Sequence, residues 1–165
     1  MTLVSSDDYK LGMRHIAAAV NVISTMENDE PRGMLATAVC SVSADPPTLL
    51  VCINKSASMH TAVVDSGCFC VSVLDERQLT TASKFLSVNG AERFKLCDWD
   101  KLDTGAPAIR SALVNFDAKV VNAVEAGSHT VFFGEVSAIR FAEDEGRPLL
   151  YHNGCYSGLS LEPLS

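Results

Sequence analysis

The chain has 165 residues, of which 47% are hydrophobic and 20% charged, and we expect residues 1–165 to form one globular domain. A formal net charge of −7 argues against general nucleic-acid binding, because such binding needs cationic side chains to neutralise phosphates. No apolar run approaches the roughly 20 residues of a membrane-spanning helix, and the first residues do not resemble a secretory signal. We therefore expect a cytoplasmic protein that binds neither membranes nor nucleic acid.

The six cysteines lie mostly among apolar or β-branched residues. This environment is typical of small core residues, so we expect reduced thiols and no disulfides. The histidines are too dispersed for a metal-ligand pattern, and no metal site is predicted.

The first third of the chain predicts one helix followed by strands. Apolar residues at helical spacing between Met13 and Val20 indicate an amphipathic helix over 7–20, which Ser5 would cap. The pattern then changes to that of strands, with a polar turn at 27–32 and a break at Asp45-Pro46-Pro47. The strands expected here cover residues 20–26, 34–43 and 48–53.

The remaining two thirds combine short helices with long strands. Helices are predicted at 57–65 and 76–87, and irregular loops over 88–111. Strands are predicted at 69–74, 112–124, 130–142 and 148–152, with a turn at 126–128. Many strands, few helices and no regular alternation of the two favour an antiparallel barrel over a doubly wound sheet. The chain also lacks both the G-x-G-x-x-G and the P-loop motif, so neither a Rossmann site nor a P-loop is expected.

Two segments could bind a flat anionic ligand. Ala36, Thr37 and Ala38 are small, which leaves room for a ring against the backbone, although plain close packing in a barrel would use the same residues. The segment Asn54–Ser58 lies between a strand and a helix, where Ser56 or Ser58 could cap the helix and Lys55 could help to hold a phosphate. An ordinary capped helix with a solvated lysine is the alternative.

Further candidates come from the second half of the chain. Ser83-Lys84-Phe85 and Arg93 could add contacts to the same anion, as could any surface helix. His129 lies beside Gly127 where a long strand begins, and could orient a carboxamide or be a simple turn residue.

Five segments follow one another in an order and spacing that resemble the short-chain flavin reductase family. They are GMLATA at 33–38, SVSADPP at 41–47, LVCIN at 50–54, CVSVL at 70–74 and SHTVFFG at 128–134. The resemblance extends from Tyr9 to Tyr156, and it is greatest to the reductase components of 4-hydroxyphenylacetate 3-monooxygenases. It implies an FMN-binding split β-barrel of antiparallel Greek-key type, a homodimer, and hydride transfer from NADH or NADPH to FMN or FAD. The reduced flavin would go to a separate monooxygenase.

The resemblance also implies roles for individual residues. Ala36, Thr37 and Ala38 would line the isoalloxazine ring, with Cys52 nearby. Asn54, Lys55, Ser56 and Ser58 would hold the ribityl chain and phosphate, with Ser83, Lys84 and Phe85 near the phosphate or an adenosine extension. His129 would lie near the nicotinamide and orient it without being an obligatory acid or base, and Tyr156 would lie near the flavin. Where the family often has basic residues after Tyr151-His152, this chain has Asn153-Gly154-Cys155, so no nucleotide phosphate contact is predicted there.

Two other functions remain open at this point. The same fold could reduce a corrinoid, a metal chelate or a quinone. It could also bind a flavin or heme without catalysis.

Overall fold

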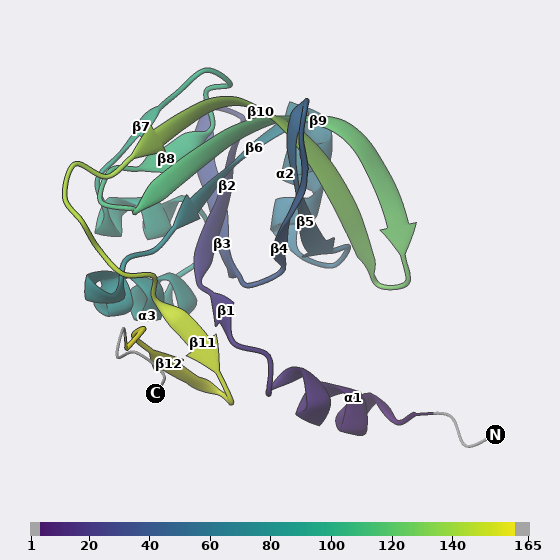
Figure 1. Ribbon diagram of the computed structural model, residues 1–165. Coiled ribbons are helices and arrows are strands. Elements are labelled where there is room, and N and C mark those ends of the chain that lie inside the picture. The colour runs from purple at the N-terminus through teal and green to yellow at the C-terminus, as the bar shows by residue number, and fades with distance from the viewer. Residues whose placement is uncertain (1–3, 161–165) are drawn as a thin grey trace.

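A computed structural model describes residues 4–160, and its main element is one seven-stranded antiparallel sheet (Figure 1). The order of strands across the sheet is β3-β2-β6-β9-β10-β5-β4. Their bounds are β2 Asn21–Glu27, β3 Glu30–Ala36, β4 Val39–Ala44, β5 Pro47–Asn54, β6 Cys68–Val73, β9 Val114–Ala126 and β10 His129–Phe141. The expected mainly β, split-barrel fold is confirmed.

The barrel is split between its two edge strands. β3 and β4 follow each other in the chain, joined only by Thr37 and Ala38, yet they lie at opposite ends of the strand order and do not pair. The prediction of a single strand over 34–43 was therefore wrong. Alternation of side chains continues through Thr37 and Ala38, but the backbone leaves one edge of the sheet there and joins the other.

The β9–β10 hairpin is the longest feature of the fold, with 13 residues in each strand. Near its open end β9 pairs with β6 through Cys68 to Val73, whereas toward the turn β10 pairs with β5 from Glu135 to His129 (Figure 1). Register shifts at Phe133/Gly134 and Val136/Ala138 bend the hairpin. At the bend Gly134 lies against Phe69, where a Cβ would come within 2.5 Å of the ring.

Two apolar clusters form the core. The first joins the sheet to helix α2 (Ser58–Ser66) through residues such as Ile23, Val51 and Phe69. The second joins β2 to helix α3 (Leu79–Ser87) and includes Phe85 and Phe94. The predicted 76–87 helix is thus two pieces, because a short 3-10 helix η1 (Glu76–Gln78) precedes α3.

The region 88–111, predicted as loops, contains short regular elements. A 3-10 helix η2 (Gly90–Leu96) places Phe94 in the core, and β7 (Trp99–Lys101) pairs with β8 (Pro107–Ile109). A C-terminal hairpin of β11 (Leu150–His152) and β12 (Cys155–Ser157) pairs with β1 (Ala18–Ala19). The strand predicted at 148–152 is therefore part of a hairpin whose second strand was missed.

The N-terminal helix is shorter than predicted. Helix α1 covers only Ser6–Met13, and Ser5 caps it as expected by accepting the Asp8 N–H at 3.0 Å. The helix ends early because Val20 lies in the core and the chain must extend to reach it. None of the residues of α1 is buried, and the helix stands apart from the barrel (Figure 1). Across residues 4–160, no helix has the length and apolar character needed to cross a bilayer.

The cysteines differ in burial more than expected. Cys70 is fully buried, and this burial raises the pKa of its thiol to about 12. Cys40 and Cys155 are exposed, so the prediction of core thiols was wrong for these two.

Replacing Gly134 with alanine should destabilise the protein, because the new Cβ would overlap the Phe69 ring at the hairpin bend. We expect the free energy of unfolding to fall by about 1–3 kcal/mol in chemical denaturation. The matched control is Gly12→Ala, where nothing lies within 4 Å of the added Cβ, and it should cause no loss. Equal stability of the two variants would contradict the close contact.

Candidate functional site

The split in the barrel exposes backbone groups beside small side chains. Thr37 and Ala38 are exposed, and in the described part of the chain their N–H groups have no protein acceptor. The carbonyl of Ala38 accepts the Cys52 N–H at 3.1 Å, and the carbonyl of Ala36 accepts the Asn21 side-chain amide at 3.2 Å. The split therefore offers two unpaired donors beside the small side chains of Ala36, Thr37 and Ala38. This is what a flat ligand with a polar edge needs.

The predicted residues of β5 and β10 form a continuous row next to the split. Cys52 adjoins Ala38 through that hydrogen bond, and in the sheet register Cys52 is opposite Val131 while Asn54 is opposite His129. Side chains alternate along β5, so Cys52 and Asn54 share one half-exposed face. Burial raises the pKa of the Cys52 thiol, which keeps it neutral and makes it a packing contact rather than a nucleophile.

The segment after β5 is ordered by its own side chains. The Asn54 carboxamide oxygen accepts the Ser56 N–H at 2.9 Å and its hydroxyl at 2.8 Å. The N-cap of α2 is Ala57 and no side chain caps the helix, so the expected capping by Ser56 or Ser58 was wrong. Ser58, the first residue of α2, is exposed.

Lys55 is not a free cation. Its ammonium group lies 2.8 Å from the carboxylate of Glu125, and its backbone N–H donates to Ser128 at 2.9 Å. The lysine in turn lowers the pKa of Glu125. Any anion that binds here must share Lys55 with this carboxylate.

The imidazole of His129 is held by its neighbour. Its Nδ1 lies 2.9 Å from the Ser128 hydroxyl, and among residues 4–160 no protein group contacts Nε2 by a hydrogen bond. His60, by contrast, is used by the fold, because its Nε2 bonds to Thr130 and its ring packs on Phe132. His129 is the histidine with a nitrogen available to a ligand at this end of β10.

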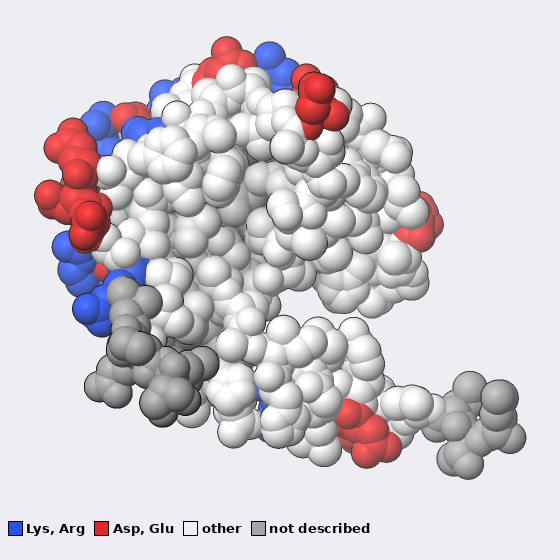
Figure 2. Space-filling view, viewed as in Figure 1, with Lys and Arg blue, Asp and Glu red and all other residues white. Residues whose placement is uncertain are grey.

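Two cavities flank the split. One, of about 460 Å³, extends from Thr37 to the C-terminal hairpin, and the other, of about 340 Å³, lies between Thr37 and α1. Thr37 and Tyr151 line both cavities, and Tyr156 lines the first, with its ring 5.4 Å from that of Tyr151. Figure 2 shows the hollow between the part of the molecule that carries α1 and the barrel above it.

The predicted residues of α3 are not brought to the same place. Ser83 and Lys84 are exposed on the helix, but neither lines the described cavities. Phe85 is 1% exposed and fills the core, so its side chain is not presented to a ligand. Arg93 donates to the backbone carbonyls of Gly33 and Val88 and therefore supports β3 instead of an anion.

Sequence reasoning missed the residues that α1 and the C-terminal hairpin add to the cavities. Tyr9, Lys10, Met13 and Arg14 line the smaller one together with Asn153. The helical spacing of these α1 residues can be read from the sequence. Nothing in the sequence shows that the helix stands apart from the barrel and lines a cavity at the split.

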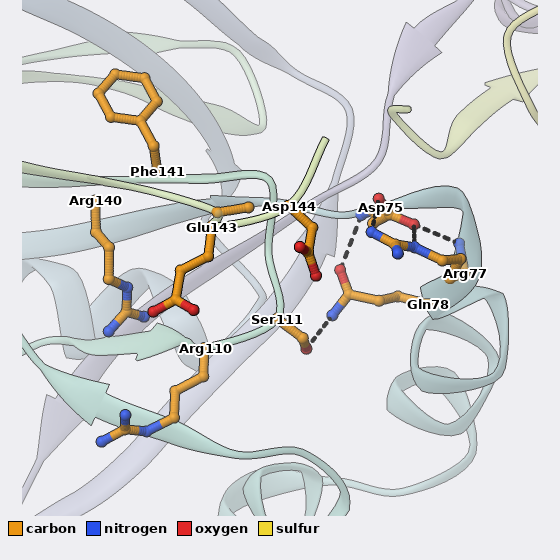
Figure 3. A pocket seen from close by; sticks show the side chains of 10 residues that line it. Asp75, Arg77, Gln78, Arg110, Ser111, Arg140, Phe141, Glu143 and Asp144 are labelled. Atoms are coloured by element: carbon orange, nitrogen blue, oxygen red, sulfur yellow. Dashed lines mark hydrogen bonds and ion pairs between the residues drawn. The ribbon is translucent and has the colours of Figure 1, made fainter. Parts of the chain in front are cut away.

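A further cavity, of about 430 Å³, lies at the other end of β10 from His129 (Figure 3). Its charges balance, with the arginines Arg77, Arg110 and Arg140 set among the acids Asp75, Glu143 and Asp144. Asp75 is buried, accepts both the backbone N–H and the guanidinium of Arg77, and thereby fixes η1. None of the predicted site residues lies here, and its arginines pair with carboxylates of the fold, Arg77 with Asp75 and both Arg110 and Arg140 with Asp100.

Residues 13–160 match the sequence profile described as the flavin reductase like domain. The chain is 39% identical over 158 residues to "FMN reductase (NADH) RutF" of Stutzerimonas stutzeri, covering 95% of this chain and 90% of that one. Among solved structures it is similar to the NADH:FAD oxidoreductase SgcE6 of Streptomyces globisporus, with a TM-score of 0.88, 29% identity and coverage of 99% and 94%. It is also similar to BorF, the flavin reductase component of a bacterial two-component tryptophan halogenase, with a TM-score of 0.85, 31% identity and coverage of 94% and 98%.

The ion pair between the buried carboxylate of Asp75 and the exposed guanidinium of Arg77 should make stability depend on pH. Its hydrogen bonds to Arg77 lower the pKa of Asp75 below its ordinary value of 3.8, so its contribution is present above that value and is lost as the pH falls through the lowered pKa. Asp75→Asn should reduce the free energy of unfolding by about 1–2 kcal/mol at pH 7, with the difference from the wild type shrinking in strong acid. Asp65→Asn, an exposed position, is the control, and a pH-independent loss in Asp75→Asn would contradict the ionic role.

Proposed function

Since this chain belongs to the family defined by the flavin reductase like domain, we propose that it transfers a hydride from a reduced nicotinamide nucleotide to a flavin. The resemblance to short-chain flavin reductases is thus confirmed at the level of the family. The observation that supports the activity is the split, where unpaired N–H groups of Thr37 and Ala38 adjoin a row of half-buried residues that ends at His129.

Ala36, Thr37 and Ala38 would carry the isoalloxazine ring. Their small side chains fit a flat ring, and the free N–H groups of Thr37 and Ala38 suit the electron-rich edge of the reduced flavin. Cys52 would contact the same ring as a neutral thiol. The flavin supplies the electron-accepting chemistry, so the residues of this chain need only stack and orient the reactants. This requirement explains why, among residues 4–160, no activated nucleophile and no acid–base pair lies at the split.

The flavin tail would extend toward the start of α2. Asn54, Ser56 and Ser58 would contact the ribityl chain and phosphate, where the uncapped N–H groups of the helix favour an anion. Lys55 would add charge while keeping its contact with Glu125. Ser83 and Lys84 are proposed only for an adenosine extension, as in FAD, because they lie on a separate helix.

His129 would orient the nicotinamide through its free Nε2, and Tyr156 would lie near the flavin across the larger cavity. The names of the similar proteins, FMN reductase (NADH) and NADH:FAD oxidoreductase, support NADH as the donor and either flavin as the acceptor. We propose the same for this chain. NADPH is the less favoured donor.

A partner oxygenase would receive the reduced flavin. The support is the similarity to BorF, the reductase component of a two-component system. The two cavities at the split are open clefts, which suits a flavin that must leave for another enzyme. We also propose a cytoplasmic location, where the free cysteines of the described chain would stay reduced.

We propose a homodimer, because an apolar pair on the outer face of β10 and β9, Val131 and Val124, is left uncovered by the described chain. Val131 lies between Cys52 on one side and Val124 on the other, and Val124 is 48% exposed. A second copy of the chain is the simplest partner for this face.

Sedimentation should give a mass close to twice the 17.6 kDa of one chain. Val124→Asp should shift the protein toward the monomer, because it places a charge in the apolar contact. The control is Val64→Asp, a valine on α2 that is 56% exposed, which should leave the mass unchanged. A monomeric wild type would refute the dimer.

The function is tested by following NADH oxidation with FMN, FAD or another acceptor. Turnover that requires free flavin supports the flavin reductase. Turnover only with a corrinoid, metal chelate or quinone would support the alternative acceptor, and binding without turnover would indicate a non-catalytic protein.

In the same assay His129→Ala should raise KM for NADH by roughly 3- to 10-fold, as expected for loss of one hydrogen bond, and change kcat less. His15→Ala, an exposed histidine that lines none of the described cavities, is the control. An abolished kcat with unchanged KM would show that His129 acts in the chemical step instead of in orientation.

A further inference from the structure

The smaller cavity at the split has a cationic wall that the proposed function has not used. Its volume is about 340 Å³, and Figure 2 shows the hollow that it occupies between α1 and the barrel. One wall is the β3–β4 connection, with the free N–H groups of Thr37 and Ala38. The opposite wall is α1, and Tyr151 and Asn153 close one side.

Helix α1 presents two kinds of side chain to this cavity. Tyr9 and Met13, four residues apart, form an apolar strip that Ile16 extends beyond the helix. Lys10 and Arg14 have the same spacing and form a cationic strip beside it. No residue of α1 is buried by the rest of the chain, so both strips are available to a ligand.

The cavity carries an excess of positive charge although the chain as a whole carries −7. Its lining residues include Lys10 and Arg14 but no carboxylate, whereas the arginines of the cavity at the far end of β10 are matched by acids. Lys10 lies 3.6 Å from Asp7, but both side chains are largely exposed and such a pair is weak. Among residues 4–160 no carboxylate lies within ion-pair distance of Arg14.

One backbone hydrogen bond attaches α1 at its end nearest the split. The Asn153 N–H donates to the Arg14 carbonyl at 2.9 Å, which attaches α1 to the turn between β11 and β12. The hairpin that contains this turn pairs through β11 with β1, the strand that directly precedes β2 of the barrel. This attachment keeps Lys10 and Arg14 in the lining of the cavity that Thr37 and Ala38 also line, even though α1 buries none of its residues.

A cavity with aromatic and cationic walls suits a phosphate ester that carries rings. Two such groups would meet at the split, the flavin phosphate and the pyrophosphate of the dinucleotide. The flavin phosphate has its proposed contacts at Asn54–Ser58, on the other side of Cys52. We propose that Lys10 and Arg14 bind the pyrophosphate of NADH, an inference that rests on the proposed function.

The test variant, Lys10→Gln/Arg14→Gln, removes both charges. Glutamine has a high helix propensity, so α1 should still form. The matched control is Lys101→Gln/Arg110→Gln, which changes the net charge equally at positions outside this cavity. Equilibrium binding of NADH, followed by its own fluorescence, should be roughly 5- to 30-fold weaker in the test variant and unchanged in the control. Added salt should weaken binding to the wild type much more than to the test variant. Lys10→Arg/Arg14→Lys, which keeps both charges, should bind as the wild type does.

Two ligand comparisons distinguish the source of the phosphate. Reduced nicotinamide mononucleotide, with one phosphate in place of the pyrophosphate, should lose less affinity than NADH. The ratio of FMN to riboflavin affinity should not change, and a loss confined to FMN would instead place the cations at the flavin phosphate.

Equal NADH affinity in the test and control variants would overturn the inference while leaving the proposed function intact. If the wild type binds NADH normally but reduces no flavin, the proposed function is refuted. The binding comparison of the variants would still test the contact of Lys10 and Arg14 with the pyrophosphate. A wild type that binds no NADH would refute both.

Discussion

The structure depends on one interruption of backbone pairing, at Thr37 and Ala38. In an ordinary hairpin β3 and β4 would pair with each other, but here the chain passes from one edge of the sheet to the opposite edge between them. Buried backbone N–H groups without acceptors are strongly unfavourable, so such an interruption is stable only where water or a ligand can satisfy it. The site is therefore a consequence of the sheet topology, and the flanking cavities follow from where the two edges separate.

The two sides of the split are held by different parts of the core, which keeps them apart. The Asn21 side chain, almost fully buried, donates to the carbonyls of Ala19 and Ala36 and fixes the end of β3 to β2. Gly33 lets Phe94 pack directly on β3, because a Cβ there would come within 2.7 Å of the ring. On the other side, β4 is attached through β5 and packs Val39 against the first cluster. Closing the split would require both attachments to break.

Sequence patterns predicted both kinds of strand, those buried on both faces, such as β2 and β6, and those that alternate between core and surface, such as β10. They could not locate the split, because Thr37 and Ala38 are small and the alternation continues through them. The same limit applies to Phe85 and to α1. An aromatic residue beside a lysine fits a ligand site or a core equally well, and only the tertiary packing against Phe94 decides. An amphipathic helix predicts a partner face without saying whether that face belongs to the barrel or to a ligand.

The elements around the split differ in rigidity in a way that fits the chemistry. Asn54 and His129 lie on paired strands of the central sheet, where their separation is fixed by the register. Hydride transfer depends steeply on the distance and angle between two rings, so in the proposed function the residues that would orient the rings need this rigidity. Helix α1 buries none of its residues and is attached mainly through one backbone hydrogen bond at Arg14. Segments with so few buried contacts open at low free energy. Under the proposed function, a wall of this kind could hold the charged part of the nucleotide during the reaction and release it afterwards without disturbing the sheet.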